Sequence, residues 1–328
     1  MILAGDIGGT KTTLGCFEPR GGALRAVSSA TYSSQEHAGL DEIIEKFLAG
    51  GAPGLLAACF GVAGPVRDGR CAATNLPWVV DERQLASRFA LRRVRLINDL
   101  EATGWAISTL EPGELATLNE GRRQASGNMG VIAAGTGLGE AGLAWDGERY
   151  IPFATEGGHC SFAPGNDLEM ELLATMRKEP GHVSVERILS GPGLHLIYRF
   201  LRDTGRGQEP GWLSEELASS DPAAAISRAA LAGRSPLCAA ALDTFVSIYG
   251  AEAGNFALKV MATGGLYVAG GIAPKILTRL KDGPFIERFT AKGRMRPLLE
   301  GIPVRVVLAE EAALRGAALC AAAGLTSA

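Results

Sequence analysis

The sequence is poor in the residues that build metal and redox centres. Its four histidines are scattered, and its six cysteines, at positions 16, 59, 71, 160, 238 and 320, include no Cys-x-x-Cys pair. A zinc or redox site therefore has no basis in the spacing. Free thiols in a reducing cytoplasm are the expected state.

Two further absences narrow the class of protein. The formal net charge is -3 and the basic residues form no run, which argues against nucleic-acid binding. No apolar run is long enough to cross a membrane, and Asp6 and Lys11 interrupt the first apolar stretch. We therefore expect neither a membrane span nor a secretory signal. The 328 residues suffice for two domains with cores of ordinary size.

The N-terminal stretch predicts a hairpin that binds phosphate between two strands. Gly8 and Gly9 lack Cβ atoms, so they can turn tightly and let backbone N–H groups approach a phosphate. Thr10 adds a hydroxyl and Lys11 a positive charge. Asp6, at the end of the first strand, is suited to hold the magnesium that accompanies ATP, directly or through water. An ordinary Gly-Gly hairpin is the alternative reading of the same residues.

The better-known P-loop motif does not fit this stretch. It requires Gly-x-x-x-x-Gly-Lys-Ser/Thr followed by a helix. Here Thr10 occupies the position of the second glycine, and the residues after Lys11 are typical of a strand.

A second glycine hairpin is expected at Gly135, Thr136 and Gly137. Glycines 137, 139 and 142 also satisfy the dinucleotide fingerprint Gly-x-Gly-x-x-Gly. We reject that interpretation because residues 141–145 and 149–153 predict strands, not a helix. No acidic residue stands about 20 positions further on to bind a ribose. The hairpin interpretation allows this loop to contact a polyphosphate.

Asn98 and Asp99 stand where a predicted strand gives way to a helix. Both residue types are preferred helix caps, and capping alone is one interpretation. The other is catalytic. Carboxylates at strand ends of an α/β domain face the ligand, and phosphoryl transfer to an alcohol needs a group that takes the hydroxyl proton. Asp99 is the candidate general base.

Two later stretches also carry polar or glycine-rich strand ends. Glu156 and His159 flank two glycines, and a carboxylate with an imidazole can bind adjacent sugar hydroxyls, although a lone histidine is more often structural. Gly270 and Gly271 follow a predicted strand, and a helix from Pro274 is expected to present its N-terminus near a nucleotide.

Taken together, these stretches resemble the bacterial glucokinase family, within the actin-like, ribonuclease H-fold sugar kinases. The resemblance covers nearly the whole chain and is carried by residues 5–12, 74–78, 97–102, 135–139, 156–164, 185–193 and 269–274. It implies a two-domain α/β fold with a central interdomain cleft. The small domain would comprise residues 1–109 and 309–328, and the large domain residues 110–308. A linker at residues 111–113 agrees with the first boundary.

The resemblance also assigns roles. Asp99 would be the catalytic base, and the sugar hydroxyls would be bound by Asn75, Asn98, Asp99, Glu156, His159 and Glu186. The phosphates would lie along Gly8, Gly9, Thr10, Gly135, Thr136 and Gly137, with Gly270 and Gly271 near the adenosine. Glu186 alone also reads as an acid at a helix N-terminus. The family is commonly dimeric, so a cytoplasmic homodimer is expected.

Two departures from the family pattern matter. Lys11 stands where many members have Asn, so its phosphate contact rests on charge alone. His159 lacks the Cys cluster that binds zinc in related sugar kinases and repressors, so no zinc is expected. No helix-turn-helix precedes Met1, so a repressor is not expected either.

The resulting hypothesis is ATP-dependent phosphorylation of glucose at its 6-hydroxyl, with Mg²⁺ on the phosphates and domain closure expelling water. Two alternatives stay open. One is a kinase for mannose, fructose or N-acetylglucosamine. The other is an actin-like nucleotide-binding regulator or filament subunit without sugar turnover.

Overall fold

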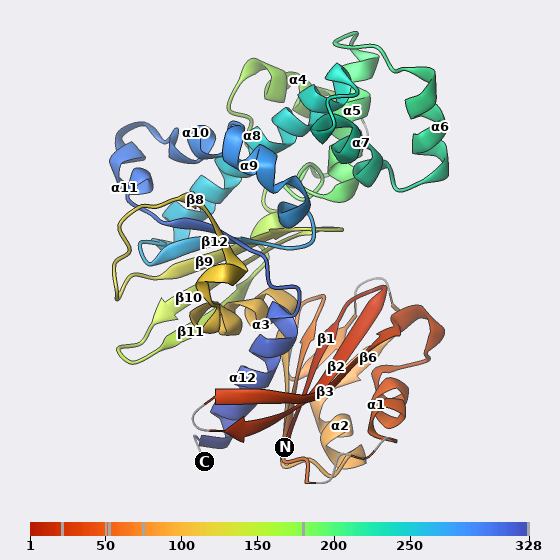
Figure 1. Ribbon diagram of the computed structural model, residues 1–328, viewed down its shortest axis with the longest axis vertical. Coiled ribbons are helices and arrows are strands. Elements are labelled where there is room, and N and C mark those ends of the chain that lie inside the picture. The colour runs from red at the N-terminus through yellow and green to blue at the C-terminus, as the bar shows by residue number, and fades with distance from the viewer. Residues whose placement is uncertain (21–22, 50, 52–53, 74–75, 179–180, 327–328) are drawn as a thin grey trace. The chain divides into compact units, whose positions relative to one another are not determined.

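The computed structural model describes residues 1–20, 23–49, 51, 54–73, 76–178 and 181–326, and it divides into two compact units (Figure 1). The first unit comprises Met1–Glu111, Glu148–Ala154 and Ala309–Ala328. The second comprises Pro112–Gly147 and Thr155–Leu308. Each unit has its own sheet and its own hydrophobic core.

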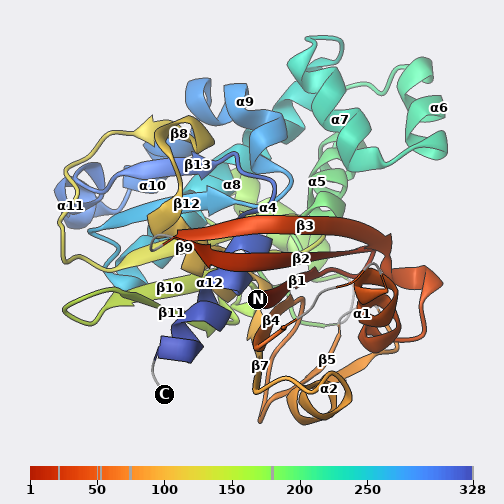
Figure 2. The ribbon, with the colours of Figure 1, turned by 60° about the horizontal axis from the view of Figure 1, so that its bottom comes forward.

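The first unit is built on a five-stranded sheet with the order β3-β2-β1-β4-β7 (Figure 2). Its strands are β1 (Ile2–Ile7), β2 (Lys11–Arg20), β3 (Ala23–Ser33), β4 (Ala57–Val62) and β7 (Arg93–Asn98). Strands β1, β4 and β7 are parallel, whereas β2 and β3 run antiparallel to their neighbours. Two short strands, β5 (Arg70–Ala72) and β6 (Val79–Asp81), pair separately.

Helices cover both faces of this sheet because its central strands bury side chains alternately on either side. Leu3 and Ile7 pack in the core shared with α1 (Leu40–Leu48) and α2 (Glu82–Arg88). Ile2 and Ala4 pack in the opposite core with α3 (Asp99–Ala106) and α12 (Ala312–Thr326). By this alternation Asp6 belongs to the α3 face.

The helices α3 and α12 approach each other closely because small residues line their contact. An added Cβ at Gly316 of α12 would lie 1.7 Å from the Ala102 carbonyl oxygen of α3. The neighbouring positions Ala317 and Ala318 are fully buried. The C-terminal helix thereby fixes the position of α3, whose first residue is Asp99.

The other large sheet has six strands in the order β11-β10-β9-β12-β13-β8, and all of them except most of β11 belong to the second unit. Its strands are β8 (Leu115–Asn119), β9 (Met129–Ala134), β10 (Leu138–Trp145), β11 (Tyr150–Thr155), β12 (Gly265–Ala269) and β13 (Val304–Val307). The helices of the second unit are α4 (Asp167–Met176), α5 (Gly191–Asp203), α6 (Gly211–Ser219), α7 (Pro222–Leu231), α8 (Pro236–Val260), α9 (Leu277–Asp282), α10 (Phe285–Thr290) and α11 (Arg296–Glu300). The core joins Ile132 of β9 and Val268 of β12 to the long helix α8.

The expected α/β class is confirmed. The rejection of the P-loop motif and of the dinucleotide fingerprint is confirmed as well. A strand, β2, follows Lys11 where a P-loop would need a helix, and strands β10 and β11 follow residues 135–137 where a dinucleotide fingerprint would need one. Asp81 caps α2, because its carboxylate accepts the N–H groups of Arg83 and Gln84.

The helix expected from Pro274 is present, but its first residues form a 3-10 helix and not an α-helix. Residues Ala273–Ile276 form a single 3-10 turn, because the Lys275 N–H donates to the Ile272 carbonyl three residues earlier. The α-helix α9 begins only at Leu277 and has 6 residues. The helical segment therefore begins at Ala273, has Pro274 in its first turn and continues directly into α9.

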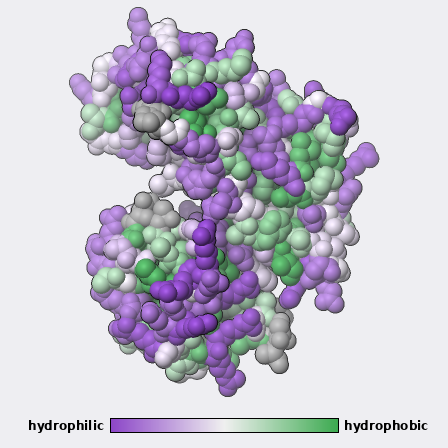
Figure 3. Space-filling view, turned by 180° about the vertical axis from the view of Figure 1, so that it is seen from behind, coloured by the Kyte–Doolittle hydropathy of each residue, from purple (hydrophilic) through white to green (hydrophobic). Residues whose placement is uncertain are grey.

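Within the described residues, no helix is both long enough and apolar enough to span a membrane. Figure 3 shows one face of the molecule, where hydrophilic residues cover much of the surface and hydrophobic residues form smaller groups among them.

We predict that Gly316→Ala destabilises the protein by at least about 2 kcal/mol, because the new methyl group would overlap the backbone of α3. Gly211→Ala is the matched control. It also lies in a helix, but its Cβ would meet no atom within 4 Å, so the change should stay within about 0.5 kcal/mol. Urea unfolding of both variants measures the difference, and equal stabilities would contradict the close packing.

Candidate active site

In the first unit, the predicted site residues gather at the carboxyl ends of three parallel strands. Asp6 of β1, Gly61 of β4 and Ile97 of β7 pair in one row across the sheet. Neighbouring strands lie about 5 Å apart. An added Cβ at Gly61 would lie 2.9 Å from the Ala102 Cβ and 3.6 Å from the Asp99 Cα. The bare backbone of Gly61 therefore lets the first turn of α3 lie on β4, beside the strand that carries Asp6.

The hairpin between β1 and β2 presents backbone donors without partners. The Gly8 N–H donates to the Lys11 carbonyl at 2.9 Å and closes the turn. Within the described residues, the N–H groups of Gly9 and Thr10 donate to no acceptor. Consecutive free N–H groups at a turn form an anion-binding concavity. The side chains of Thr10 and Lys11 are exposed beside them.

Ser34, which was not predicted from the sequence, holds this hairpin in place. Its hydroxyl donates to the Gly8 carbonyl at 2.7 Å and lies 2.9 Å from the Thr12 hydroxyl, while its N–H donates to the Thr10 carbonyl at 2.9 Å. Ser34 is fully buried. No local motif marks it, because it reaches the hairpin from 26 residues away.

Burial raises the pKa of Asp6 to about 6. The cause is desolvation, which disfavours the charged carboxylate. Asp6 therefore holds its proton about two pH units higher than an exposed aspartate would. A cation beside it would favour the charged form and lower that pKa.

Asn98 and Asp99 both lie where β7 gives way to α3. Asn98 is the N-cap of α3, since its Oδ1 accepts the Leu100 N–H at 2.9 Å. Its Nδ2 donates to the Gly64 carbonyl at 3.5 Å, which ties α3 to the loop after β4. Asp99 is the first residue of the helix, and its Oδ1 also lies 2.9 Å from the Leu100 N–H. Capping therefore accounts for Asn98, and it leaves Asp99 at a helix N-terminus, where the helix dipole favours an anion.

In the second unit, two glycine stretches lie at neighbouring strand ends. Strands β9 and β12 are parallel, so residues 135–137 and 270–271 follow them at the same edge of the sheet. Gly270 has a φ of +83°, and an added Cβ would lie 2.6 Å from the Ala134 carbonyl oxygen. Within the described residues, the N–H groups of Thr136, Gly137, Gly270 and Gly271 have no acceptor. This edge therefore repeats the anion-binding property of the first hairpin.

Glu186 connects the glycine hairpin to the proposed sugar-binding residues. Its Oε2 accepts the Leu138 N–H at 2.9 Å, while its Oε1 lies 3.7 Å from the His159 Nδ1. Glu186 lies in a turn, so its interpretation as a helix N-terminal acid is wrong. His159 Nε2 lies 3.8 Å from the Glu156 Oε2. Both His159 distances exceed a hydrogen bond, so these polar groups remain able to bind hydroxyls.

Two glycines explain why Glu156 and His159 project from this turn. Residues Gly157–His159 form a 3-10 turn that lies directly on β10. An added Cβ at Gly158 would lie 2.1 Å from the Leu138 carbonyl oxygen, and one at Gly157 would lie 1.8 Å from the Glu140 Oε2. The turn fits against the strand only without side chains at these positions. As a result, the side chains of Glu156 and His159 are 58% and 61% exposed.

The structure thus brings the predicted residues together in two groups, one in each unit. The first group holds Asp6, Gly8, Gly9, Thr10, Lys11, Asn98 and Asp99, and the second holds Gly135, Thr136, Gly137, Glu156, His159, Glu186, Gly270 and Gly271. Asn75 lies outside the described residues. The buried Glu140 of β10, beneath the second group, was not expected from the sequence.

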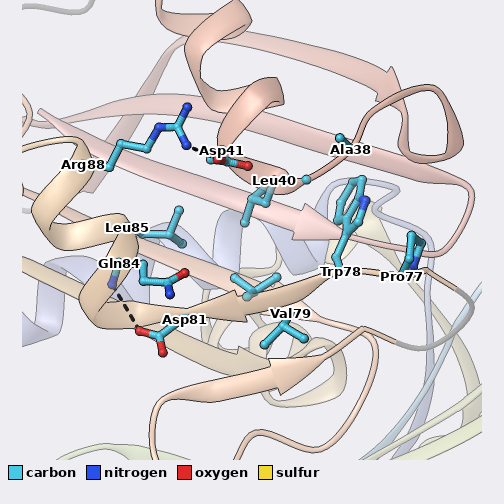
Figure 4. A pocket seen from close by; sticks show the side chains of 12 residues that line it. Ala38, Leu40, Asp41, Pro77, Trp78, Val79, Asp81, Gln84, Leu85 and Arg88 are labelled. Carbon is cyan, nitrogen blue, oxygen red and sulfur yellow. Dashed lines mark hydrogen bonds and ion pairs between the residues drawn. The ribbon is translucent and has the colours of Figure 1, made fainter.

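A separate pocket of about 270 Å³ lies in the first unit between α1, α2 and β6 (Figure 4). Its lining includes the ion pair between Asp41 and Arg88, together with Trp78. The Trp78 indole donates to the His37 carbonyl at 3.1 Å, which anchors the chain after β5. None of the predicted sugar or phosphate residues lines this pocket.

The residues present fit a magnesium ion that is carried by ATP. Among the described residues, no group of three or more His, Cys, Asp or Glu side chains could hold a metal alone. Mg²⁺ does not require such a group, since it is usually bound by one or two carboxylates, waters and the phosphates of the substrate. Asp6, a carboxylate beside a phosphate-binding hairpin, supplies a suitable oxygen donor.

Comparison with known proteins gives matches over nearly the whole chain. The family model described as Glucokinase matches residues 3–324. A glucokinase of Nostoc punctiforme is 43% identical, over 98% of this chain and 99% of that protein. A crystal structure of a glucokinase from an Antarctic psychrotroph has a TM-score of 0.84 at 31% identity and covers 98% of both chains.

A ROK-family glucokinase from Streptomyces griseus, crystallised in complex with glucose and AMPPNP, has a TM-score of 0.67 at 22% identity, over 98% of this chain and 99% of that one. At that identity the likeness concerns the fold alone. The matches confirm the actin-like sugar-kinase fold and the resemblance stated from the sequence. The chain belongs to the glucokinase family.

Proposed function

We propose that this protein transfers the γ-phosphate of ATP to the 6-hydroxyl of glucose, giving glucose 6-phosphate and ADP. The observation that carries the proposal is the double role of Glu186. One of its oxygens holds the glycine hairpin at Leu138, and the other faces His159 of the exposed polar turn. A phosphate-binding loop and a hydroxyl-binding group are thereby joined through a single side chain.

In this proposal, Glu156, His159 and Glu186 bind the sugar hydroxyls, and Asn75 and Asn98 assist them. Asp99 accepts the proton of the 6-hydroxyl as the oxygen attacks the γ-phosphate. The free N–H groups of the two hairpins hold the phosphates, with Gly270 and Gly271 near the adenosine. Mg²⁺, held with ATP by Asp6, would neutralise phosphate charge. On the basis of the family resemblance, the proposal includes that the protein is a homodimer in the cytoplasm.

An assay of ADP release with a panel of sugars tests the proposal. We expect ADP release to depend on glucose and to be matched by formation of glucose 6-phosphate. A higher kcat/KM with mannose, fructose or N-acetylglucosamine than with glucose would identify that sugar as the substrate instead. ATP turnover that no sugar stimulates would favour the actin-like regulator instead.

In the same assay, Asp99→Ala should lower kcat by about 10²–10⁴, because a positioned general base contributes that factor. Glu101→Gln is the control, since Glu101 also carries a carboxylate in the first turn of α3 and has no proposed role. Unchanged circular dichroism and unfolding midpoints would show that the fold is intact. A variant that keeps more than half of the rate would refute Asp99 as the base.

Asp6→Asn should make the ligand-free protein more stable at pH 8 but not at pH 4. The pKa of Asp6 is raised to about 6 in the folded protein and lies near 4 when unfolded. Between these values only the folded chain keeps the proton, so stability falls as the pH rises, by up to about 3 kcal/mol. Asparagine removes that loss. Urea unfolding at both pH values measures it, and an equal effect at each would contradict it.

Glu186→Ala should raise the KM for both glucose and ATP, because its carboxylate contacts both the turn and the hairpin. Glu156→Ala should raise the KM for glucose alone, since Glu156 faces only His159 among the described residues. Steady-state kinetics with each substrate varied in turn provide the comparison. Identical patterns in the two variants would count against the double role of Glu186.

A further inference from the structure

Glu140 lies beneath the turn that carries Glu156 and His159. It projects from β10 and is only 2% exposed. An added Cβ at Gly157 would lie 1.8 Å from the Glu140 Oε2, so the carboxyl group lies directly against the bare backbone of that turn. The Thr155 hydroxyl donates to the Glu140 backbone carbonyl at 2.9 Å and accepts the Gly157 N–H at 3.2 Å. The backbone of Glu140 and its side chain therefore both support the turn.

The surroundings of Glu140 suit a neutral acid better than a carboxylate. Its Oε1 is buried and has no hydrogen-bond partner in the described part of the chain. Burial, followed by repulsion from Glu252, raises the pKa of Glu140 to about 7, while Lys259 acts in the opposite direction. A buried carboxylate without a hydrogen-bond donor is costly in free energy, so these surroundings disfavour the ionised form of Glu140.

We propose that Glu140 is a positioning residue that links proton binding to sugar binding. As the neutral acid it supports the turn Gly157–His159. When Glu140 ionises, its carboxylate needs a water molecule or a cation beside it, and the turn shifts to make room. Glu156 and His159 then lose the geometry that binds the sugar. The inference rests on the proposed role of these two residues in binding the sugar.

The titratable groups near Glu140 define what the test must separate. On α8 these are Tyr249, Glu252 and Lys259, and on or next to the turn they are His159 and Cys160. Lys259 lies 3.3 Å from the Glu252 Oε1. The test therefore needs a variant that removes the ionisable group of Glu140 and leaves His159 in place.

Glu140→Gln provides that variant, because glutamine has the shape of the neutral acid and does not ionise. In the unmodified enzyme, the KM for glucose should rise at least threefold between pH 6.5 and pH 8.5, with little change in kcat. In Glu140→Gln the KM should stay flat and close to the low-pH value. A rise in this variant equal to that of the unmodified enzyme would overturn the proposal and point to His159.

Two further variants should move the pH midpoint of the KM transition without changing a residue of the turn. Glu252→Gln removes a negative charge and should shift the KM transition to lower pH, whereas Lys259→Met removes a positive charge and should shift it to higher pH. A purely structural role for Glu140 predicts no such opposite shifts. The variants Glu252→Gln and Lys259→Met also test the proposal if Glu140→Gln does not fold. The proposal is overturned if the KM transition shifts in the same direction in both variants, or in neither.

His159→Ala separates failure of this inference from failure of the sugar site. If that variant leaves the KM for glucose unchanged, the proposed sugar-binding turn is wrong, and the role of Glu140 falls with it. If it raises the KM but Glu140→Gln keeps the pH dependence of the unmodified enzyme, the sugar-binding turn stands and only the linkage to Glu140 is refuted.

Discussion

Parallel pairing of strands decides where the candidate site residues lie. Because β1, β4 and β7 run in the same direction, Asp6 and the residues that follow β7 reach the same edge of the first sheet. The pairing of β9 with β12 does the same for the two glycine stretches of the second unit. The polar groups that follow these strands are consequently ordered by the sheet, although they are far apart in sequence.

The candidate site also requires backbone without side chains at its turns. A side chain from elsewhere in the chain hydrogen-bonds to each of the two glycine hairpins. The first hairpin is fixed by the buried hydroxyl of Ser34, and the second by the carboxylate of Glu186. Gly157 and Gly158 let a turn lie flat on β10, so that polar side chains can project from it. The acids Asp6 and Glu140 are kept at strand positions where desolvation raises their pKa values, which costs stability as the pH rises above about 4. Such a cost is typical of functional sites.

The sequence predicted the parts of this arrangement that depend on local pattern. Glycine pairs at strand ends and the strand after Lys11 are both encoded within a few residues. The parts it did not predict depend on distant contacts. Ser34 meets Gly8 across 26 residues, and Glu186 meets Leu138 across 48. The helix at Pro274 shows a further limit, because a proline at a helix start does not tell whether the first turn is 3-10 or α-helical.

We propose that free backbone N–H groups at these strand ends bind the phosphates of ATP. Amide nuclear magnetic resonance during titration with Mg-ATP tests it most directly. The largest chemical-shift changes should fall on the amides of Gly9, Thr10, Thr136 and Gly137, with smaller changes at Gly270 and Gly271. Saturable binding whose shifts centre on the separate pocket around Trp78, and leave the hairpin amides unmoved, would contradict it.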